Sequence, residues 1–336
     1  MTKPNQNSNT KIPKVVVIGG GTGSFVALSG LKKYPIDLTA IVTMMDSGGS
    51  SGRLRDELGV LPPGDIRQCL VALATSSKLL RDLFMYRFEE GDLKGHNFGN
   101  IFLSSLEKTT GSMEKAITEV SKILRIHGHV VPVTFKKADL CVELIDGKII
   151  TGETHIDEVE TKMNRARIKK AFLTPSVTAN PNALKSIIEA DFILIGPGDL
   201  YTSIIPNLLV KGIANALKKS KAHKIYVMNL MTKYGQTTHY TAIDHISDLE
   251  KYIGKKTINS ILLNTKRPTK ETLSWYEDFD EQPVIDNLKD SIYSVIKKDL
   301  LKNIVLKKSP TDSLKRSIIR HDSIKLAKAV MEIISN

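Results

Sequence analysis

Three loops rich in glycine, serine and aspartate carry the residues of this 336-residue chain that could do chemistry. The first loop, residues 19–23 (GGGTG), follows a β-branched run at 15–18 and precedes a helical pattern that starts at Ser24. Glycines in such a turn let backbone N–H groups approach a phosphate at the positive end of the helix. The order of strand, turn and helix therefore predicts a phosphate-binding loop.

This glycine turn fits the dinucleotide fingerprint G-x-G-x-x-G only in part. Gly19 and Gly21 match the first two glycines, and Ser24 stands in place of the third. A turn that merely joins a strand to a helix is the structural alternative. The chain has no Walker pattern after the turn and no H-E-x-x-H motif, which argues against an ordinary nucleoside triphosphatase and a zinc protease.

The second loop, residues 46–55 (DSGGSSGRLR), offers several donors to phosphate oxygens. Serine hydroxyls and backbone N–H groups bind phosphate, and Arg53 could add bidentate, charge-assisted bonds to a pyrophosphate. Asp46 follows a predicted strand at 38–43, where an acidic residue often holds a ribose hydroxyl. It could also bind a metal ion that accompanies phosphates. The alternatives are an Asx turn at Asp46 and arginines that face solvent.

Two further residues lie beside helix starts. Asp65 follows Pro-Pro-Gly at 62–64, and a helical pattern begins there, so an N-cap role competes with a role in binding metal or substrate. His96 lies before the next helical pattern and could act as an acid, a base or a donor, although such a histidine is more often structural.

The third loop, residues 196–203 (GPGDLYTS), follows a predicted strand at 192–195. Its glycines permit close approach, and Thr202 and Ser203 supply hydroxyls beside a helix start. Another predicted strand ends near Asn229. Because ligands of open parallel sheets bind beyond the carboxyl ends of the strands, we expect these loops to form one ligand site.

The elements that position these loops alternate between strands and helices, which predicts an α/β fold with a mostly parallel sheet. Residues 129–170 change character: strand patterns at 130–134 and 140–144, and an Asp-Gly turn at 146–147 that links to 148–151, predict an antiparallel β-hairpin insertion. We expect a flexible tail over residues 1–13 and a single domain over 14–336. The motif 320–322 (RHD) could form a catalytic set, but an N-cap of the closing helix explains it more simply.

Composition narrows the class of protein. The net charge is +12, and half of it lies after residue 286, but the lysines are not interleaved with aromatics, so we expect a solvated surface and no nucleic-acid partner. Two cysteines outside any C-x-x-C pair fit a reducing compartment. The polar start of the chain predicts no signal peptide, and no apolar run is long enough to span a bilayer. We therefore expect a cytoplasmic protein without membrane insertion.

The chain resembles the gluconeogenesis-factor (YvcK-type) branch of the family that includes 2-phospho-L-lactate transferase. Five segments match that family in order, and 320–322 extends the likeness over nearly the whole chain. The segments are IGGGTG (18–23), DSGGSSGRLR (46–55), PPGDIR (62–67), GHNFGN (95–100) and GPGDLYTS (196–203).

This resemblance implies a Rossmann-like fold with helices on both faces of the sheet and a nucleotide-linked ligand. In the transferase branch, a phospholactyl group moves from a guanosine-diphosphate carrier to a deazaflavin with the help of magnesium. In the branch that this chain resembles, the implied role is regulatory. Such proteins bind uridine-diphosphate (UDP) sugars and support cell shape and wall synthesis during growth on gluconeogenic carbon.

The resemblance also implies site residues. The phosphate and ribose site is expected at Gly20, Gly21, Thr22, Gly23, Asp46, Ser50, Ser51 and Arg53. Gly198 and Asn229 are expected to border the base or the second half of the ligand. Two departures stand out: Asp199 replaces an expected serine, and Gln236 replaces an expected glutamate, which weakens any metal role at that position.

Two hypotheses follow. The first is a regulator that binds a UDP-sugar, needs no cofactor, tolerates Mg²⁺ with its ligand and acts through a protein partner in cell-wall synthesis, with a homo-oligomer possible. The second is a magnesium-dependent transferase in which Asp46 and Asp65 hold the metal. A dinucleotide-dependent oxidoreductase is a weaker third reading because the fingerprint is imperfect.

Overall fold

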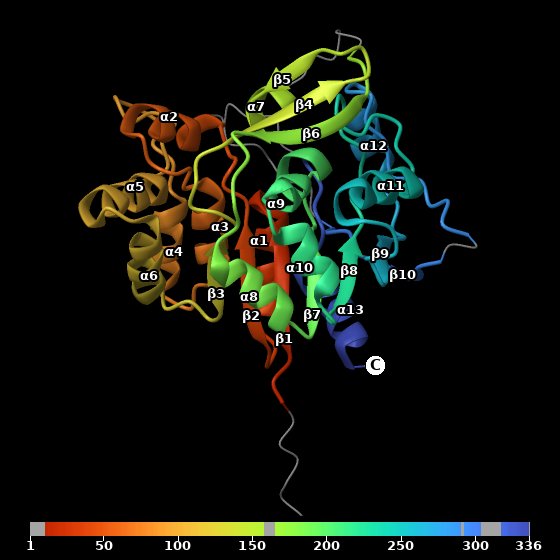
Figure 1. Cartoon of the computed structure of the whole chain (residues 1–336), viewed down its shortest axis with the longest axis horizontal. Helices are drawn as coiled ribbons and strands as arrows, with labels where there is room; N and C mark the ends of the chain where they lie inside the picture. Colours follow the sequence, from red (N-terminus) through yellow and green to blue (C-terminus); the bar gives the residue numbers. More distant parts are fainter. Residues whose placement is uncertain (1–10, 158–164, 290–291, 304–316, 336) are drawn as a thin grey trace, which may run out of the picture.

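The computed structural model describes residues 11–157, 165–289, 292–303 and 317–335, and its centre is a seven-stranded parallel sheet (Figure 1). The strand order is β10-β9-β8-β7-β1-β2-β3. This is the doubly wound order 3-2-1-4-5-6 with one more strand, so the predicted Rossmann-like α/β fold is confirmed. The strands are β1 (Lys14–Gly19), β2 (Asp37–Val42), β3 (His129–Pro132), β7 (Phe192–Ile195), β8 (His223–Val227), β9 (Ser260–Asn264) and β10 (Ser294–Lys298).

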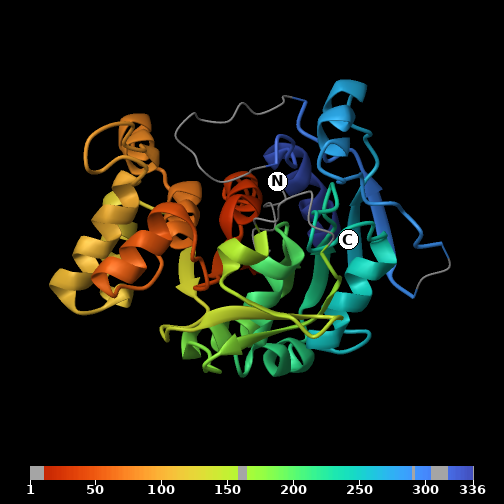
Figure 2. The same ribbon diagram turned by 90° about the horizontal axis from the view of Figure 1, so that it is seen from above.

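Helices cover both faces of this sheet, as Figures 1 and 2 show. On one face α1 (Gly21–Leu31) packs against α13 (Ser323–Ser335), and on the other lie α8 (Pro181–Glu189) and α10 (Ile213–Lys219). The other helices are α2 (Gly49–Leu58), α3 (Gly64–Leu73), α4 (Lys78–Met85), α5 (Phe98–Thr110), α6 (Met113–Leu124), α7 (Glu153–Asp157), α9 (Ile205–Leu209), α11 (Ala242–Ile253) and α12 (Lys270–Glu277), with a π-helical turn η1 (Leu200–Ile204).

The core lies between the sheet and these two helical layers. In β1 the run 15–18 is buried on both faces, as a central strand of a parallel sheet must be. Gly30 of α1 has no room for a side chain, because the carbonyl oxygen of Ser323 occupies that space. This close approach of α1 to α13 fixes the helix whose first turn faces the candidate site.

The insertion differs from the predicted one at its edges. The Asp-Gly turn does join two antiparallel strands, β4 (Asp139–Leu144) and β5 (Ile149–Thr151), and β6 (Ile168–Thr174) completes a three-stranded sheet. The strand predicted near 130–134, however, is β3, which pairs in parallel with β2 at the edge of the main sheet. Neighbouring strand patterns in sequence do not reveal which sheet each one joins.

Other local predictions also change. The segment 46–55, described from sequence as a loop, contains most of α2, and the helical segment after η1 is broken into α9 and α10. Gly212 lies at that break with φ +106°, a left-handed conformation that favours glycine. Most of the tail expected over residues 1–13 lies outside the described residues.

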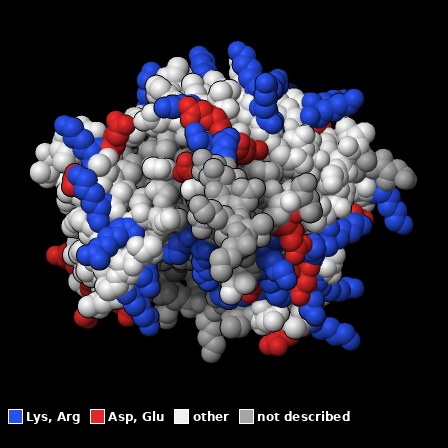
Figure 3. Space-filling model, turned by 90° about the horizontal axis from the view of Figure 1, so that it is seen from below, with Lys and Arg blue, Asp and Glu red and all other residues white. Residues whose placement is uncertain are grey.

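Charged side chains cover much of the surface, as the many lysines of the sequence lead us to expect. Figure 3 shows the face at the amino ends of the parallel strands, where Lys and Arg side chains are spread widely with acidic ones among them. Within the described ranges, no helix is both long and apolar enough to cross a membrane.

Candidate functional site

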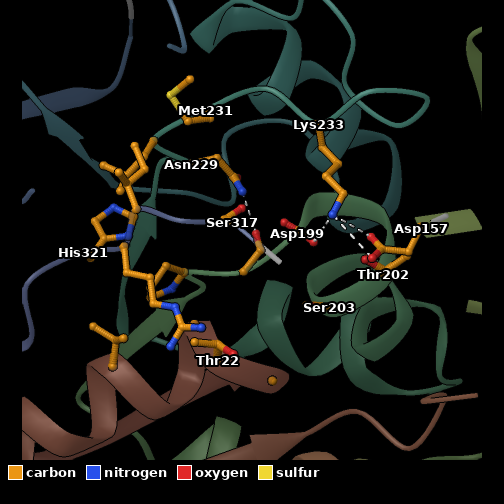
Figure 4. A pocket seen from close by; sticks show the side chains of 18 of the residues that line it. Thr22, Asp157, Asp199, Thr202, Ser203, Asn229, Met231, Lys233, Ser317 and His321 are labelled. Atoms are coloured by element: carbon orange, nitrogen blue, oxygen red, sulfur yellow. Dashed lines mark hydrogen bonds and ion pairs between the residues drawn. The ribbon is translucent and has the colours of Figure 1, made fainter. Parts of the chain in front are cut away.

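A cavity of about 240 Å³ opens at the carboxyl ends of the parallel strands, beside the boundary between β1 and β7. The strand order reverses direction at this boundary, which is the place where doubly wound sheets bind ligands. The cavity wall comes from the loops that follow β1, β2, β7 and β8, from α7 of the insertion and from residues 317–321 (Figure 4). The predicted convergence of the strand-end loops is thus present in the structure.

The glycine turn forms one side of the cavity. Gly21, Thr22 and Gly23 line it as the first turn of α1. The N-cap residue Gly20 is extended and has no side chain to cap the helix, so the first N–H groups of α1 are available to a ligand. Gly20 itself lies behind the wall, where a Cβ would meet the Asp65 carboxylate.

Acidic side chains form a second part of the wall. The Asp46 carboxylate accepts a 2.9 Å hydrogen bond from the Gly48 N–H, which is the Asx turn considered as the alternative for this residue, and it also lines the cavity. Asp65 lines the cavity too; the N-cap position of α3 belongs to Pro63, so Asp65 is not the cap. Glu153 joins them from α7. Its pKa is well above the usual range because it is buried near other carboxylates, Asp46 first among them.

Lys233 is a buried cation on the same wall. Its Nζ lies 3.1 Å from Oδ1 of Asp157 and 3.7 Å from Oδ2 of Asp199 (Figure 4). Burial alone would lower the pKa of Lys233, but the surrounding carboxylates outweigh burial and raise it. Gln236 donates a 2.8 Å hydrogen bond to Oδ1 of Asp157. The cluster joins α7 to the loops after β7 and β8.

Asn229 and Gly198 meet across the cavity. The Asn229 Nδ2 donates a 2.8 Å hydrogen bond to the Gly198 carbonyl oxygen, and both residues line the wall. A second cavity of about 490 Å³ lies beyond Asn229 and Leu230, at the ends of β8 and β9. The two cavities share Asn229, Leu230 and Ile319 as a partition.

Besides Gly20, three more residues of the predicted ligand site lie away from this cavity wall: Ser50, Ser51 and Arg53. Ser50 and Ser51 are buried between α2 and α5, where the Ser50 hydroxyl accepts bonds from Asn97 and Asn100. Arg53 is exposed and donates a 2.9 Å bond to the Lys94 carbonyl oxygen. None of the three lines the cavity. The physical reason is that residues 49–58 fold as α2, and this helix directs its serine side chains towards α5.

The remaining candidate residues divide between site and scaffold. His96 is buried, with its Nδ1 3.3 Å from the Ser50 hydroxyl, and does not line the cavity. Asp322 caps α13 by accepting bonds from the N–H groups of Ile324 and Lys325. Arg320 and His321 line the cavity. Burial lowers the pKa of His321 to about 4, so its imidazole is neutral.

Sequence reasoning missed Glu153, Asp157 and Lys233. Glu153 and Asp157 belong to a short helix of the insertion, and Lys233 follows a strand by several residues. No glycine-rich turn or strand end marks these positions. Only the folding of the three-stranded sheet over the parallel sheet brings them to the cavity.

The strand order and the cavity at its switch point define a Rossmann-type α/β protein. Residues 15–301 match the family described as 2-phospho-L-lactate transferase CofD. The chain belongs to this family.

Similar proteins extend the match over almost the whole chain. A protein named gluconeogenesis factor from Bacillus subtilis is 42% identical over 327 residues, which cover 96% of this chain and 98% of that protein. Another of that name, from Halalkalibacterium halodurans, is 40% identical and covers 96% and 97% of the two chains. A crystal structure of a UPF0052 family member from Bacillus halodurans has a TM-score of 0.87 at 39% identity, with 96% of this chain and 100% of that chain covered.

Proposed function

We propose that this chain is a regulatory protein that binds a UDP-sugar in the cavity between β1 and β7. The observation that carries the proposal is the meeting of the uncapped first turn of α1, at Gly21–Gly23, with Gly198 and Asn229 at the switch point. A helix N-terminus attracts a diphosphate, and the Asn229 amide offers directional bonds to a base or sugar. Lys233 and Arg320 add positive charge to the same wall.

The two adjacent cavities suit a ligand with two ends. A nucleotide sugar is larger than a cavity of about 240 Å³, and the neighbouring cavity of about 490 Å³ supplies the further space. With the diphosphate at the first turn of α1, one end of the ligand would pass Asn229 towards β9.

The acidic part of the wall supports a divalent cation bound together with the ligand. The described side chains include no group of three or more His, Cys, Asp or Glu residues arranged as a complete metal site. Two carboxylates, Asp46 and Asp65, nevertheless suit Mg²⁺, which prefers a few carboxylates together with waters and phosphate oxygens. Bound Mg²⁺ would neutralise the diphosphate next to these carboxylates.

Regulation is the role that the names of the relatives support. Full-length relatives are called gluconeogenesis factors, although the family takes its name from a transferase. We infer that the protein acts in the cytoplasm, through a protein partner of cell-wall synthesis, and supports cell shape during growth on gluconeogenic carbon.

Isothermal titration calorimetry with UDP-N-acetylglucosamine, with and without Mg²⁺, tests the binding step. We expect saturable one-site binding that GDP-sugars and NAD do not reproduce at the same concentrations. Tight binding of another nucleotide together with no binding of UDP-sugars would refute the proposal.

A magnesium-dependent transferase is the second candidate, and the carboxylates at Asp46, Asp65 and Glu153 favour it. In that case Asp46 and Asp65 would hold the metal and the N–H groups of α1 would orient the diphosphate. The test is incubation with Mg²⁺ and candidate nucleotide-diphosphate donors, followed by chromatography for released nucleoside monophosphate. Release of nucleoside monophosphate that the substitution Asp65→Asn abolishes would establish a transferase. If donors bind and none releases nucleoside monophosphate, the regulatory function is favoured.

A further inference from the structure

The turn that carries two hydroxyls of the cavity wall is held from behind by a buried network. Thr202 and Ser203 line the cavity within the π-helical turn η1, and the residue before them, Tyr201, points away from it. The Tyr201 hydroxyl donates a 2.5 Å hydrogen bond to Oδ2 of Asp248 on α11. Both side chains are buried, and neither lines the cavity.

Asp248 is the centre of this network. Its Oδ2 also accepts a 2.6 Å hydrogen bond from the Tyr240 hydroxyl, and Lys251 pairs with its Oδ1. A carboxylate that accepts two hydroxyl donors and one ammonium is well satisfied, which makes it a rigid reference point. The network therefore fixes Tyr201 with respect to α11.

The two tyrosines share the same acceptor atom but connect to different parts of the protein. Tyr201 belongs to η1, the turn that carries Thr202 and Ser203. Tyr240 connects to the insertion, because the Arg167 guanidinium lies 4.2 Å from the centre of its ring and Nε donates a 3.1 Å bond to its hydroxyl. Arg167 directly precedes β6. Both rings are almost fully buried, so loss of either hydroxyl leaves a similar defect at Asp248.

A second anchor holds the other side of η1. The buried Asn207 side chain donates from Nδ2 to the carbonyl oxygens of Gly19 and Ser203, at 3.1 and 2.9 Å. This bond ties the turn to the start of the glycine loop. The orientation of η1 is thus fixed by Tyr201 on one side and by Asn207 on the other. Single π-helical turns of this kind are frequent at functional sites.

We propose that Asp248 and Tyr201 are positioning residues that hold the Thr202 and Ser203 hydroxyls in place for the ligand of the cavity. The inference rests on the proposed function, because it assumes an anionic nucleotide ligand in this cavity. Hydroxyls that must meet phosphate or sugar oxygens lose their bonds when they move by a fraction of an ångström. Neither positioning residue touches the ligand itself.

The test compares Tyr201→Phe with Tyr240→Phe as matched variants, with UDP-N-acetylglucosamine as the probe in calorimetry. Each variant removes one hydroxyl donor from the same oxygen of Asp248, and Tyr240→Phe also removes the acceptor of the Arg167 bond, so we expect its melting temperature to fall at least as far as that of Tyr201→Phe. Only Tyr201→Phe should raise the dissociation constant, by about tenfold, the effect of roughly one lost hydrogen bond. Asp248→Asn, which keeps the side-chain size, should follow Tyr201→Phe.

A ligand-independent measurement separates this inference from the proposed function. In protein with ¹³C-labelled threonine methyl groups, Tyr201→Phe should shift the Thr202 resonance and Tyr240→Phe should leave it in place. If wild type fails to bind UDP-sugars, the proposed function fails and the Thr202 resonance still decides the positioning role. An unchanged Thr202 resonance in Tyr201→Phe, or equal loss of affinity in both tyrosine variants, would overturn the inference.

Discussion

Gly23 of the first helix lies directly against the carbonyl oxygen of Pro197, with no room for even one carbon atom between them. This contact joins the loop after β1 to the loop after β7, the two strands at the switch point of the sheet. The glycine loop therefore has two roles: it exposes N–H groups to the cavity and it lets the two loops meet. Both roles depend on the missing side chain.

Gly23→Ala should destabilise the protein, because the added methyl group would collide with backbone atoms that cannot rotate away. Overpacking of this kind costs about 1–3 kcal/mol of the free energy of unfolding, which urea denaturation measures. Gly48→Ala is the control: its nearest neighbour would be the Thr154 hydroxyl at 3.2 Å, the end of a movable side chain. Equal effects of the two substitutions would contradict this packing argument.

Substitution of two arginines tests whether a residue must line the cavity to affect binding. Arg320 lines the cavity, so Arg320→Ala should weaken binding of a UDP-sugar by about 1.5–3 kcal/mol if it contacts the diphosphate. Arg53 bonds to Lys94 outside the cavity, so Arg53→Ala should change the affinity by no more than about twofold. Calorimetric titration of both variants measures the difference. A large loss in Arg53→Ala would return Arg53 to the ligand site.

Lys233→Met should destabilise the protein, because it leaves the partly buried carboxylates of Asp157 and Asp199 without their cation. Removal of one partner from a fully buried pair costs about 3–5 kcal/mol, and we expect a smaller loss here because the Asp199 side chain is 37% exposed and water screens its charge. Burial already raises the pKa of Asp199, and loss of Lys233 would raise it further. When a carboxyl group has a higher pKa in the folded than in the unfolded state, the free energy of unfolding decreases as pH rises and the group ionises. The variant should therefore be closer to wild type in acid than at neutral pH.

The double variant Lys233→Met with Asp199→Asn supplies the control for this electrostatic account. Because it removes one cation and one anion together, it should recover part of the loss seen in urea denaturation at neutral pH. Failure of the second substitution to restore any stability would mean that Lys233 acts through packing of its aliphatic chain.

His321 makes the folded state sensitive to acid. Its pKa in the folded protein is about 4, below the value of about 6.5 expected when unfolded. The unfolded state therefore takes up a proton first, and stability should fall as pH decreases from about 6.5 to about 4, by about 3 kcal/mol in total. His321→Asn should flatten the dependence of the free energy of unfolding on pH in this window. Parallel profiles for wild type and variant would assign the acid sensitivity to other groups.

The sequence alone determined the architecture and the strand-end loops of the site. Runs such as 15–18 and 192–195 are continuous and β-branched or aliphatic, which only a strand buried on both faces explains. The glycines of 19–23 and 196–198 mark turns after such strands. Since parallel strands end at one edge of a sheet, Gly21–Gly23, Asp46, Gly198 and Asn229 could be brought together without coordinates.

Tertiary structure decided which polar residues reach the cavity. Ser50, Ser51 and Arg53 belong to a motif rich in donors, yet α2 turns the serines towards α5 and the arginine away from the cavity. Glu153, Asp157 and Lys233 carry no local signal and come together only because the three-stranded insertion folds over the parallel sheet. The direction of a side chain depends on packing between elements distant in sequence, which a local sequence pattern does not predict.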